Sequence, residues 1–89
     1  MIIIDDKKYD LIENFRDAFN EEEFKEYFTD YFYKYDYIVG DYAYSKLRLK
    51  GFYEDNKKEA KELNKIKNKD KYIKDNCAYE CKYFVLKKI

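Results

Sequence analysis

The sequence predicts an α+β domain with a mostly antiparallel sheet of about five strands, in the order β-β-α-β-β-α-β, and one main aromatic-faced helix packed on the sheet. Residues 37–42 and 47–53 form two neighbouring runs rich in β-branched and aromatic side chains, which favour strands. Residues 24–35 repeat aromatic side chains at the spacing of one helical face. Residues 83–86 are apolar on both faces, as in a strand that is covered on both sides or lies centrally in a sheet.

The composition indicates one small ordered domain that covers residues 1–89. A chain of this size buries only about 60–65% of its unfolded surface, so its core must be dense. Twelve Tyr and seven Phe supply that density. The apolar run at residues 2–4 is too short for a secretion signal, and no run approaches the roughly 20 residues of a membrane helix. We therefore expect a cytoplasmic protein without membrane contact.

Two short strands are expected near the start of the chain, over residues 2–4 and 9–13. Residues 5–8 are polar and lie between the two strands as a turn. Strands this close in the sequence are usually joined as a hairpin. The first two strands should therefore be neighbours in the sheet.

A helix should begin after Asn20, because Asn side chains cap helices and Glu23 completes a capping-box pattern three residues later. The apolar residues that follow repeat at helical spacing and are all aromatic: Phe24, Tyr27, Phe28, Tyr31, Phe32 and Tyr35. Such a stripe usually packs on the protein's own sheet, although it also suits a partner-binding or base-stacking face. We expect one core helix over residues 24–35.

The second run of the central hairpin alternates between the two faces of a strand. Leu47, Leu49 and Tyr53 lie on one face, towards the core and the aromatic helix. The other face carries three cations and one aromatic residue: Lys46, Arg48, Lys50 and Phe52. We expect this second face to lie in water.

The later part of the chain is less regular. Residues 55–67 are polar and Lys-rich, and predict a mobile connection with a possible helical turn, although propensity permits a helix over 57–64. Asn68 can cap a short helix over 69–75. The apolar residues of this helix and its end would point inward: Tyr72, Ile73 and Cys77. A final strand is expected over 78–86.

Three segments resemble the YutD-like family, a set of small cytoplasmic proteins of Gram-positive bacteria: residues 36–41 (DYIVGD), 47–52 (LRLKGF), and the stretch from Cys77 through Cys81 to residues 83–86 (YFVL). Phe19 and Asn20 match an aromatic–Asn pair that often precedes the first helix of this family. Glu80 stands where the family often has Gly. The resemblance runs from about residue 20 to the last residue. It implies an α+β domain and supplies no reaction and no ligand.

Side chains that commonly carry catalysis are scarce. The chain has no His, and it has one Ser (Ser45) and one Thr (Thr29). Gly40 and Gly51 stand alone, so there is no glycine-rich phosphate loop. The spacing of the carboxylates marks no pair for acid–base work. We therefore expect a protein that is not an enzyme.

Cys77 and Cys81 are too few for a structural zinc site, which usually takes four Cys or His ligands. Carboxylates or a second subunit would have to complete such a site. In a reducing compartment, two small buried thiols are the simpler interpretation, and a redox pair is the alternative. No cofactor and no metal are expected.

Charge is divided unevenly along the chain although the formal sum is zero. Residues 1–36 carry five cations and eleven anions, and residues 37–89 carry fourteen cations and eight anions. The two halves can pack together and neutralise each other. A basic region can also mark a nucleic-acid surface.

The candidate interaction surface is the cationic face of the hairpin with the tyrosines beside it: Lys46, Arg48, Lys50, Phe52, Tyr42 and Tyr44. Cations beside aromatic rings can hold phosphates while the rings stack on bases. The simpler interpretation is a solvated face on which Arg48 pairs with Glu54 or with the acidic helix. The sequence thus favours a small non-catalytic binding module for RNA or a ribonucleoprotein. A protein-interaction adaptor or homo-oligomer is the alternative.

Overall fold

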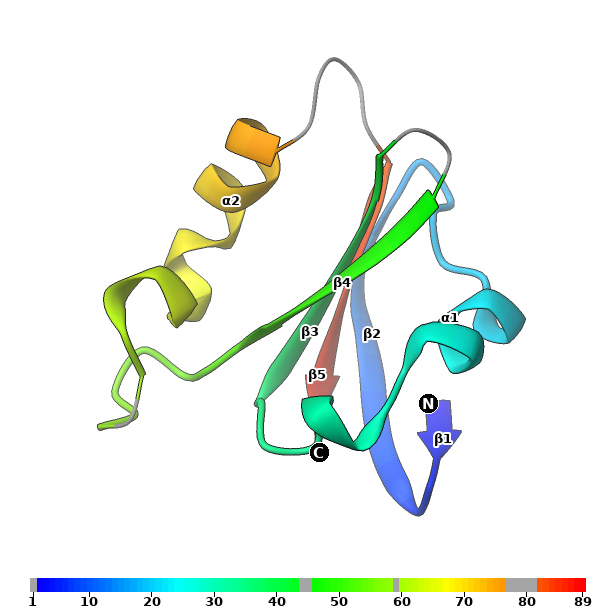
Figure 1. The fold of residues 1–89 in the computed structure, drawn as a ribbon, viewed down its shortest axis with the longest axis horizontal. Coiled ribbons are helices and arrows are strands. Elements are labelled where there is room, and N and C mark those ends of the chain that lie inside the picture. Colours follow the sequence, from blue (N-terminus) through cyan, green and yellow to red (C-terminus); the bar gives the residue numbers. More distant parts are fainter. Residues whose placement is uncertain (1, 44–45, 59, 77–81) are drawn as a thin grey trace.

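The computed structural model describes residues 2–43, 46–58, 60–76 and 82–89 of the chain (Figure 1). Within these residues five strands form one antiparallel sheet: β1 (Ile2–Ile4), β2 (Lys7–Phe15), β3 (Tyr37–Ala43), β4 (Lys46–Phe52) and β5 (Tyr83–Lys88). The helical elements are α1 (Glu21–Tyr27), α2 (Lys69–Asn76) and three short 3₁₀ turns, η1 (Asp30–Phe32), η2 (Glu62–Asn64) and η3 (Ile66–Asn68). The predicted α+β class and the predicted order of strands and helices are confirmed.

β5 comes last in the chain but lies in the middle of the sheet, whose strand order is β1-β2-β5-β3-β4. It pairs with β2 on one side and with β3 on the other. Phe84, Val85 and Leu86 are fully buried, which confirms the prediction of a central strand covered on both faces. The predicted start of this strand at residue 78 lies outside the described residues.

The β1–β2 hairpin is tighter than the sequence suggests. Ile4 pairs directly with Lys7, so two residues make the turn instead of four. Asp5 and Asp6 both adopt left-handed backbone angles, with φ of 50° and 64°. A two-residue turn of this kind matches the twist of the strands, and Asp tolerates the left-handed region better than most residues.

α1 begins as predicted and ends earlier. The Oδ1 of Asn20 accepts a hydrogen bond from the backbone N–H of Glu23 at 3.0 Å, which is the expected cap. The helix stops at Tyr27 because Phe28 and Thr29 adopt extended backbone angles, and η1 follows as a separate turn. The expectation of one helix over residues 24–35 is therefore wrong.

The aromatic rings gather in the core despite this break. The ring of Phe28 lies 5.1 Å from that of Phe24 and 5.9 Å from that of Phe32, measured between centroids. Phe24 and Phe28 are buried, whereas Tyr27 and Tyr31 are exposed. The predicted stripe thus divides into buried Phe24, Phe28 and Tyr35, a half-buried Phe32, and two tyrosines in solvent.

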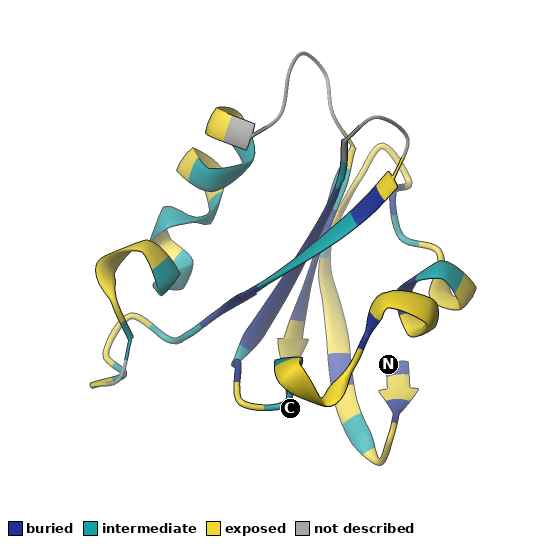
Figure 2. Cartoon of the chain, in the orientation of Figure 1, coloured by how far each residue is buried: buried dark blue, intermediate teal, exposed yellow. Residues whose placement is uncertain are grey.

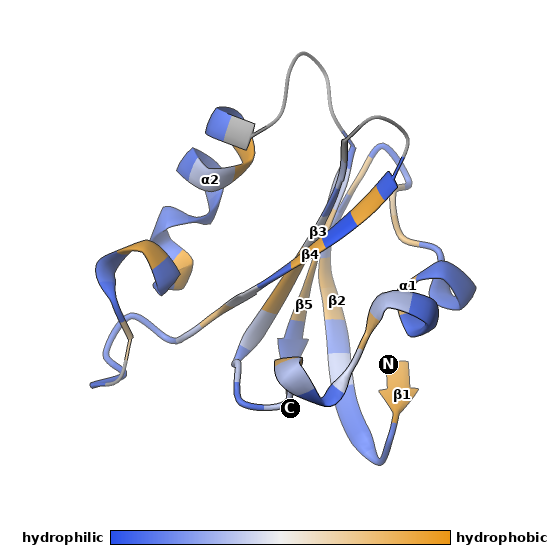
Figure 3. Ribbon diagram, viewed as in Figure 1, coloured by the Kyte–Doolittle hydropathy of each residue, from blue (hydrophilic) through white to orange (hydrophobic). Residues whose placement is uncertain are grey.

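The central strands β3 and β5 are largely buried (Figure 2) and carry apolar residues (Figure 3), and α1 and α2 lie on opposite sides of the sheet in Figure 1. On the side of α1, Leu47 and Leu49 pack into the larger core cluster, as predicted. On the side of α2 a second cluster contains Tyr37, Val39, Phe52 and Val85, with Ile66, Tyr72, Ile73 and Tyr83 packed against it. The inward orientation of Tyr72 and Ile73 was also predicted.

Backbone contacts join the residue after β4 to the described residues that lead into α2. Tyr53 donates its N–H to the Asn64 carbonyl at 2.7 Å and accepts from the Ile66 N–H at 2.9 Å. Asn68 donates from Nδ2 to the Glu62 carbonyl at 2.7 Å. The predicted connection therefore contains two 3₁₀ turns, and α2 follows them against the sheet. Among the helices of the described residues, none is long and apolar enough to cross a membrane.

The two glycines allow aromatic rings to pack directly against the backbone of the sheet. A Cβ at Gly40 would overlap the ring of Phe84, its cross-strand neighbour on β5. A Cβ at Gly51 would overlap the ring of Tyr35. Neither glycine has a positive φ, so close approach of the rings, and not backbone freedom, requires the missing side chain.

Candidate interaction surfaces

The structure distributes the predicted interaction residues over both faces of the sheet. The four residues of β4 lie on the side of α2: Lys46, Arg48, Lys50 and Phe52. Tyr42 lies on the other side, where it packs against the larger core cluster. Tyr44 is outside the described residues. The six residues therefore do not form one continuous face.

Arg48 is held by Asp41, its cross-strand partner on β3. Its Nη2 lies 2.8 Å from Oδ2 of Asp41 and its Nε lies 3.3 Å from Oδ1. The Asp41 side chain is 1% exposed and that of Arg48 is 38% exposed. The hydrogen bond to Asp41 raises the pKa of Arg48 above its ordinary value. The expected pairing of Arg48 with a carboxylate exists, but the partner is Asp41 and not Glu54 or the acidic helix.

Phe52 is fully buried, which corrects the expectation that it would lie in water beside the cations. Its ring meets that of Tyr72 on α2 edge to face, with 5.7 Å between centroids. Its place on the strand has the predicted parity, but the second face of the sheet is covered here. Phe52 therefore has no surface on which a base could stack.

A groove of about 350 Å³ lies between β4 and α2. It is lined by residues of both charge signs and by one prominent apolar side chain: Lys50, Glu62, Leu63, Asn68, Lys71, Tyr72 and Asp75. Leu63 is 76% exposed. Lys65 and Lys67 pair with Glu62 beside the groove, at 3.2 and 3.1 Å. This balance of charges makes the groove a mixed surface and not a phosphate channel.

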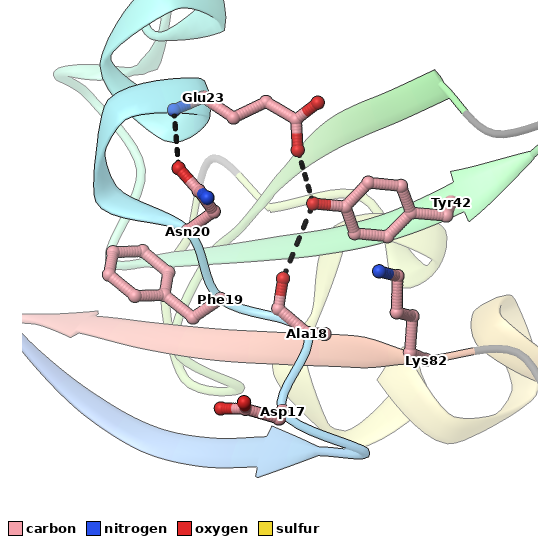
Figure 4. A pocket seen from close by; sticks show the side chains of 7 residues that line it. All are labelled: Asp17, Ala18, Phe19, Asn20, Glu23, Tyr42 and Lys82. Atoms are coloured by element: carbon pink, nitrogen blue, oxygen red, sulfur yellow. Dashed lines mark hydrogen bonds between the residues drawn. The ribbon is translucent and has the colours of Figure 1, made fainter.

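A polar cleft of about 610 Å³ opens on the side of α1 (Figure 4) and is lined by Asp17, Ala18, Phe19, Asn20, Glu23, Tyr42 and Lys82. The hydroxyl of Tyr42 donates to the Glu23 carboxylate and lies 3.3 Å from the Ala18 carbonyl oxygen. Burial and the bond to Glu23 raise the pKa of Tyr42 to about 12. Lys82 lies 4.3 Å above the Tyr42 ring. These groups bind one another, so Tyr42 ties α1 to β3.

Residues 21–31, which include α1 and the start of η1, are rich in carboxylates; we call them the acidic tyrosine segment. Five carboxylates and one Lys give it a net charge of −4: Glu21, Glu22, Glu23, Glu26, Asp30 and Lys25. Tyr27 is 44% exposed and Tyr31 is 58% exposed. Sequence reasoning assigned both tyrosines to the core stripe because of their spacing, and kept a partner-binding face only as the alternative.

The described residues contain no group of three or more His, Cys, Asp or Glu side chains that could hold a metal ion. Cys77 and Cys81 lie outside the described residues, so the predictions of buried thiols or of a redox pair stay predictions.

Comparison with known proteins adds a family and a solved fold. A family model described as "YutD-like: Putative antitoxin YutD-like" matches residues 3–87. A Bacillus subtilis (strain 168) protein named "Putative antitoxin YutD" is 49% identical over 89 residues, which are 100% of this chain and 98% of that protein. The solution NMR structure of protein yutD from B. subtilis matches with a TM-score of 0.84 and 49% identity, over 100% of this chain and 81% of that chain.

Proposed function

Because the chain belongs to the YutD-like family, we propose that it is a non-catalytic module that binds a partner protein through the acidic tyrosine segment. The family model carries the description "Putative antitoxin", which suits a protein that acts by binding. We therefore favour the adaptor alternative of the sequence analysis over RNA binding. The partner is identified only by the chemistry of the surface that would receive it.

The observation that carries this proposal is the exposure of Tyr27 and Tyr31 on a segment rich in carboxylates. The Nζ of Lys34, just after the segment, lies 4.8 Å over the Tyr31 ring. Tyrosine is enriched in protein interfaces because it buries a large rigid ring and keeps a polar end. The ring of Tyr31 is supported from within by Phe32 and Tyr35, with centroids at 5.1 and 5.8 Å. Tyr31 is therefore preorganised as an anchor, which lowers the entropy lost on binding.

Charge selects the class of partner. A net charge of −4 over eleven residues repels phosphates and attracts a protein surface rich in Lys and Arg. The nucleic-acid-binding face of a protein has this chemistry, and an antitoxin that covers such a face would block it. Association should therefore weaken as the salt concentration rises.

RNA binding through β4 stays as the second candidate, because Lys46 is exposed and Lys50 and Lys71 line the groove beside it. Three findings weigh against it. Phe52 is buried, Arg48 is engaged by Asp41, and two carboxylates line the same groove: Glu62 and Asp75. The aromatic ring expected to stack on a base is therefore buried, and the guanidinium expected to bind a phosphate is already paired.

The test begins with a tagged form of the chain in a nuclease-treated lysate of B. subtilis, the source of the 49% identical relative. The retained protein is identified, purified and titrated against the chain by calorimetry. Tyr31→Ala should weaken the complex about 10- to 30-fold, as expected for an aromatic anchor. Leu63→Ala is the matched control, since it removes an exposed apolar side chain outside the segment and should leave the affinity unchanged.

The competing function is tested in parallel by titrating fluorescent single-stranded RNA at about 50 and about 200 mM salt. If RNA binds and Lys50→Ala weakens it, while no purified protein binds in a Tyr31-dependent way, the proposal is wrong. A nuclease-resistant complex that Tyr31→Ala weakens and Leu63→Ala does not would support it.

A further inference from the structure

The exposed ring of Tyr31 carries a cation from the chain itself. The Nζ of Lys34 lies 4.8 Å from the centroid of the Tyr31 ring and 5.3 Å from that of the Tyr35 ring. Both distances are within the range of about 6 Å over which an ammonium group is attracted to an aromatic ring. The two rings are 5.8 Å apart and inclined by 53°, so a single ammonium group contacts both. We call these two rings the tyrosine pair.

The tyrosine pair is held in place from the inside. Tyr35 is 7% exposed, and its hydroxyl donates to that of Tyr31 at 3.2 Å. The Tyr35 ring also packs against Gly51, where a Cβ would overlap it, and lies 4.8 Å from the ring of Tyr53. Tyr31 is 58% exposed. The pair is therefore a fixed aromatic surface that a cation in solvent can reach.

Lys34 itself is held only weakly. Its side chain is exposed, and it forms no ion pair with another described residue. By contrast, Lys57 lies over the neighbouring Tyr53 ring and also pairs with Asp36 at 3.7 Å. An exposed contact between a cation and a ring is worth little by itself, and a free lysine side chain regains rotamer freedom. Another cation can thus take the place of Lys34 on the rings.

We propose that the tyrosine pair is the site that receives an arginine or lysine side chain of the partner, and that Lys34 occupies this site in the chain by itself. The inference rests on the proposed function, in which the partner surface is basic. Asp30 lies next to Tyr31 in the acidic tyrosine segment, whose charge concentrates cations beside the pair. Two cations in contact repel each other, so the partner has to displace Lys34. Lys34 is therefore an autoinhibitory residue.

A capped triarginine peptide tests the site without knowledge of the partner. Its dissociation constant is measured by NMR titration of the full chain at about 50 mM salt. Lys34→Gln should bind the peptide about 2- to 5-fold more tightly than the unaltered chain, because the competing cation is gone. Lys34→Arg keeps a cation over the rings and should bring no gain.

Lys25→Gln is the matched control for charge. It removes one cation from the acidic tyrosine segment, as Lys34→Gln removes one just after it, but Lys25 pairs with the Glu21 carboxylate at 3.2 Å. Its gain in affinity should stay below about 2-fold, since an exposed pair of this kind is worth little. Tyr31→Leu should abolish the gain that Lys34→Gln brings, because the ring on which the two cations compete is then absent.

Displacement of Lys34 also has a direct spectroscopic sign. Protons above an aromatic ring resonate upfield, so the ε-methylene protons of Lys34 should be shifted upfield in the chain by itself. They should return towards the ordinary lysine position as the peptide saturates the chain. A merely electrostatic attraction of the peptide to the carboxylates would leave them unchanged.

Four results would each overturn the proposal: a peptide that does not bind, a peptide that binds the Tyr31→Leu and unaltered chains equally, a Lys34→Gln chain that gains no more than Lys25→Gln, or Lys34 resonances that do not move. The proposed function is judged separately, on the purified partner protein. A partner that depends on Tyr31 but does not distinguish Lys34→Gln from Lys25→Gln would leave the function in place and remove the site. Peptide binding as expected, with no partner protein, would remove the function and leave the site.

Discussion

Arg48 on β4 donates hydrogen bonds to the buried carboxylate of Asp41 on β3, with Nη2 2.8 Å from Oδ2. A carboxylate without contact to water needs a counter-charge and hydrogen-bond donors, and a guanidinium supplies both in one planar group. The pair sits at the exposed rim of the second core cluster, near Tyr72. Arg48 is thus a structural residue of the hairpin as much as a surface cation.

Replacement of Arg48 by Ala should lower the free energy of unfolding by about 2–3 kcal/mol, because it leaves the Asp41 carboxylate buried without its partner. This loss of stability is smaller than that expected when a fully buried ion pair is broken, because the Arg48 side chain is 38% exposed. Lys46→Ala, on the same strand face, should change stability by less than about 0.5 kcal/mol. Urea denaturation measures both, and equal effects of the two variants would contradict this account.

Gly40→Ala should destabilise the protein by about 2–3 kcal/mol, because the added methyl overlaps the ring of Phe84. Phe84→Leu should relieve part of this cost, so the two changes should couple by about 1 kcal/mol in a double-mutant cycle. Gly51→Ala is the control, since its methyl would meet Tyr35 instead. Its effect should add to that of Phe84→Leu without coupling.

Tyr9→Phe should leave stability unchanged or raise it by up to about 1 kcal/mol. The Tyr9 hydroxyl is buried and has no hydrogen-bond partner among the described residues, so its removal relieves a desolvation penalty. Tyr42→Phe removes a hydroxyl that binds Glu23 and should cost about 1–2 kcal/mol. Denaturation curves that rank the two variants in the reverse order would refute the assignment of these hydroxyls.

Alkaline pH should destabilise the fold through its tyrosines. Burial and the bond to Glu23 raise the pKa of Tyr42 to about 12, and the bond from its hydroxyl to Asp5 raises the pKa of Tyr33 to about 12. Since both values exceed 10.0, the ordinary value, these groups add stability that is fully present below about pH 10 and lost as the pH rises through about 12.

The ultraviolet absorbance of tyrosinate measures this directly. In the native protein, part of the tyrosinate absorbance should appear at a higher pH than it does in urea, and unfolding should accompany it. Tyr42→Phe should make the stability less dependent on pH between about 10 and 12, because the change removes one of the groups whose pKa differs between the two states. Coincident titration curves in the two solvents would contradict the prediction.

The strands could be predicted because the alternation of apolar and polar residues leaves only one face of each strand that can point into the core. Leu47 and Leu49 had to share one face, and the run at residues 83–86 had no polar face to turn outward. The end of α1 could not be predicted, because the aromatic spacing continues through it. Phe28 and Phe32 still stack across the break, so the same spacing serves a helix, an extended pair and a 3₁₀ turn.

The alternation of residues along β4 could not show whether its basic face would be exposed or covered. Phe52 has the parity that the sequence assigned to it, but parity does not reveal which face a distant element covers. The sequence predicted that Tyr72 and Ile73 of α2 point inward but not which face of the sheet they cover, and Tyr72 packs edge to face on Phe52. Likewise Tyr27 and Tyr31 matched the core spacing, yet both lie in solvent, Tyr27 on α1 itself and Tyr31 after its end.

The position of β5 has a consequence for how the protein is made. A nascent chain that has reached residue 76 contains two separate hairpins, β1–β2 and β3–β4. These hairpins join into one sheet only when residues 83–88 leave the ribosome and β5 pairs with both of them. Pairings such as Tyr9 with Lys88 span almost the whole chain, so closure is slow compared with local helix formation. Until then the bare edges of β2 and β3 are open to chaperones, to proteases and to aggregation.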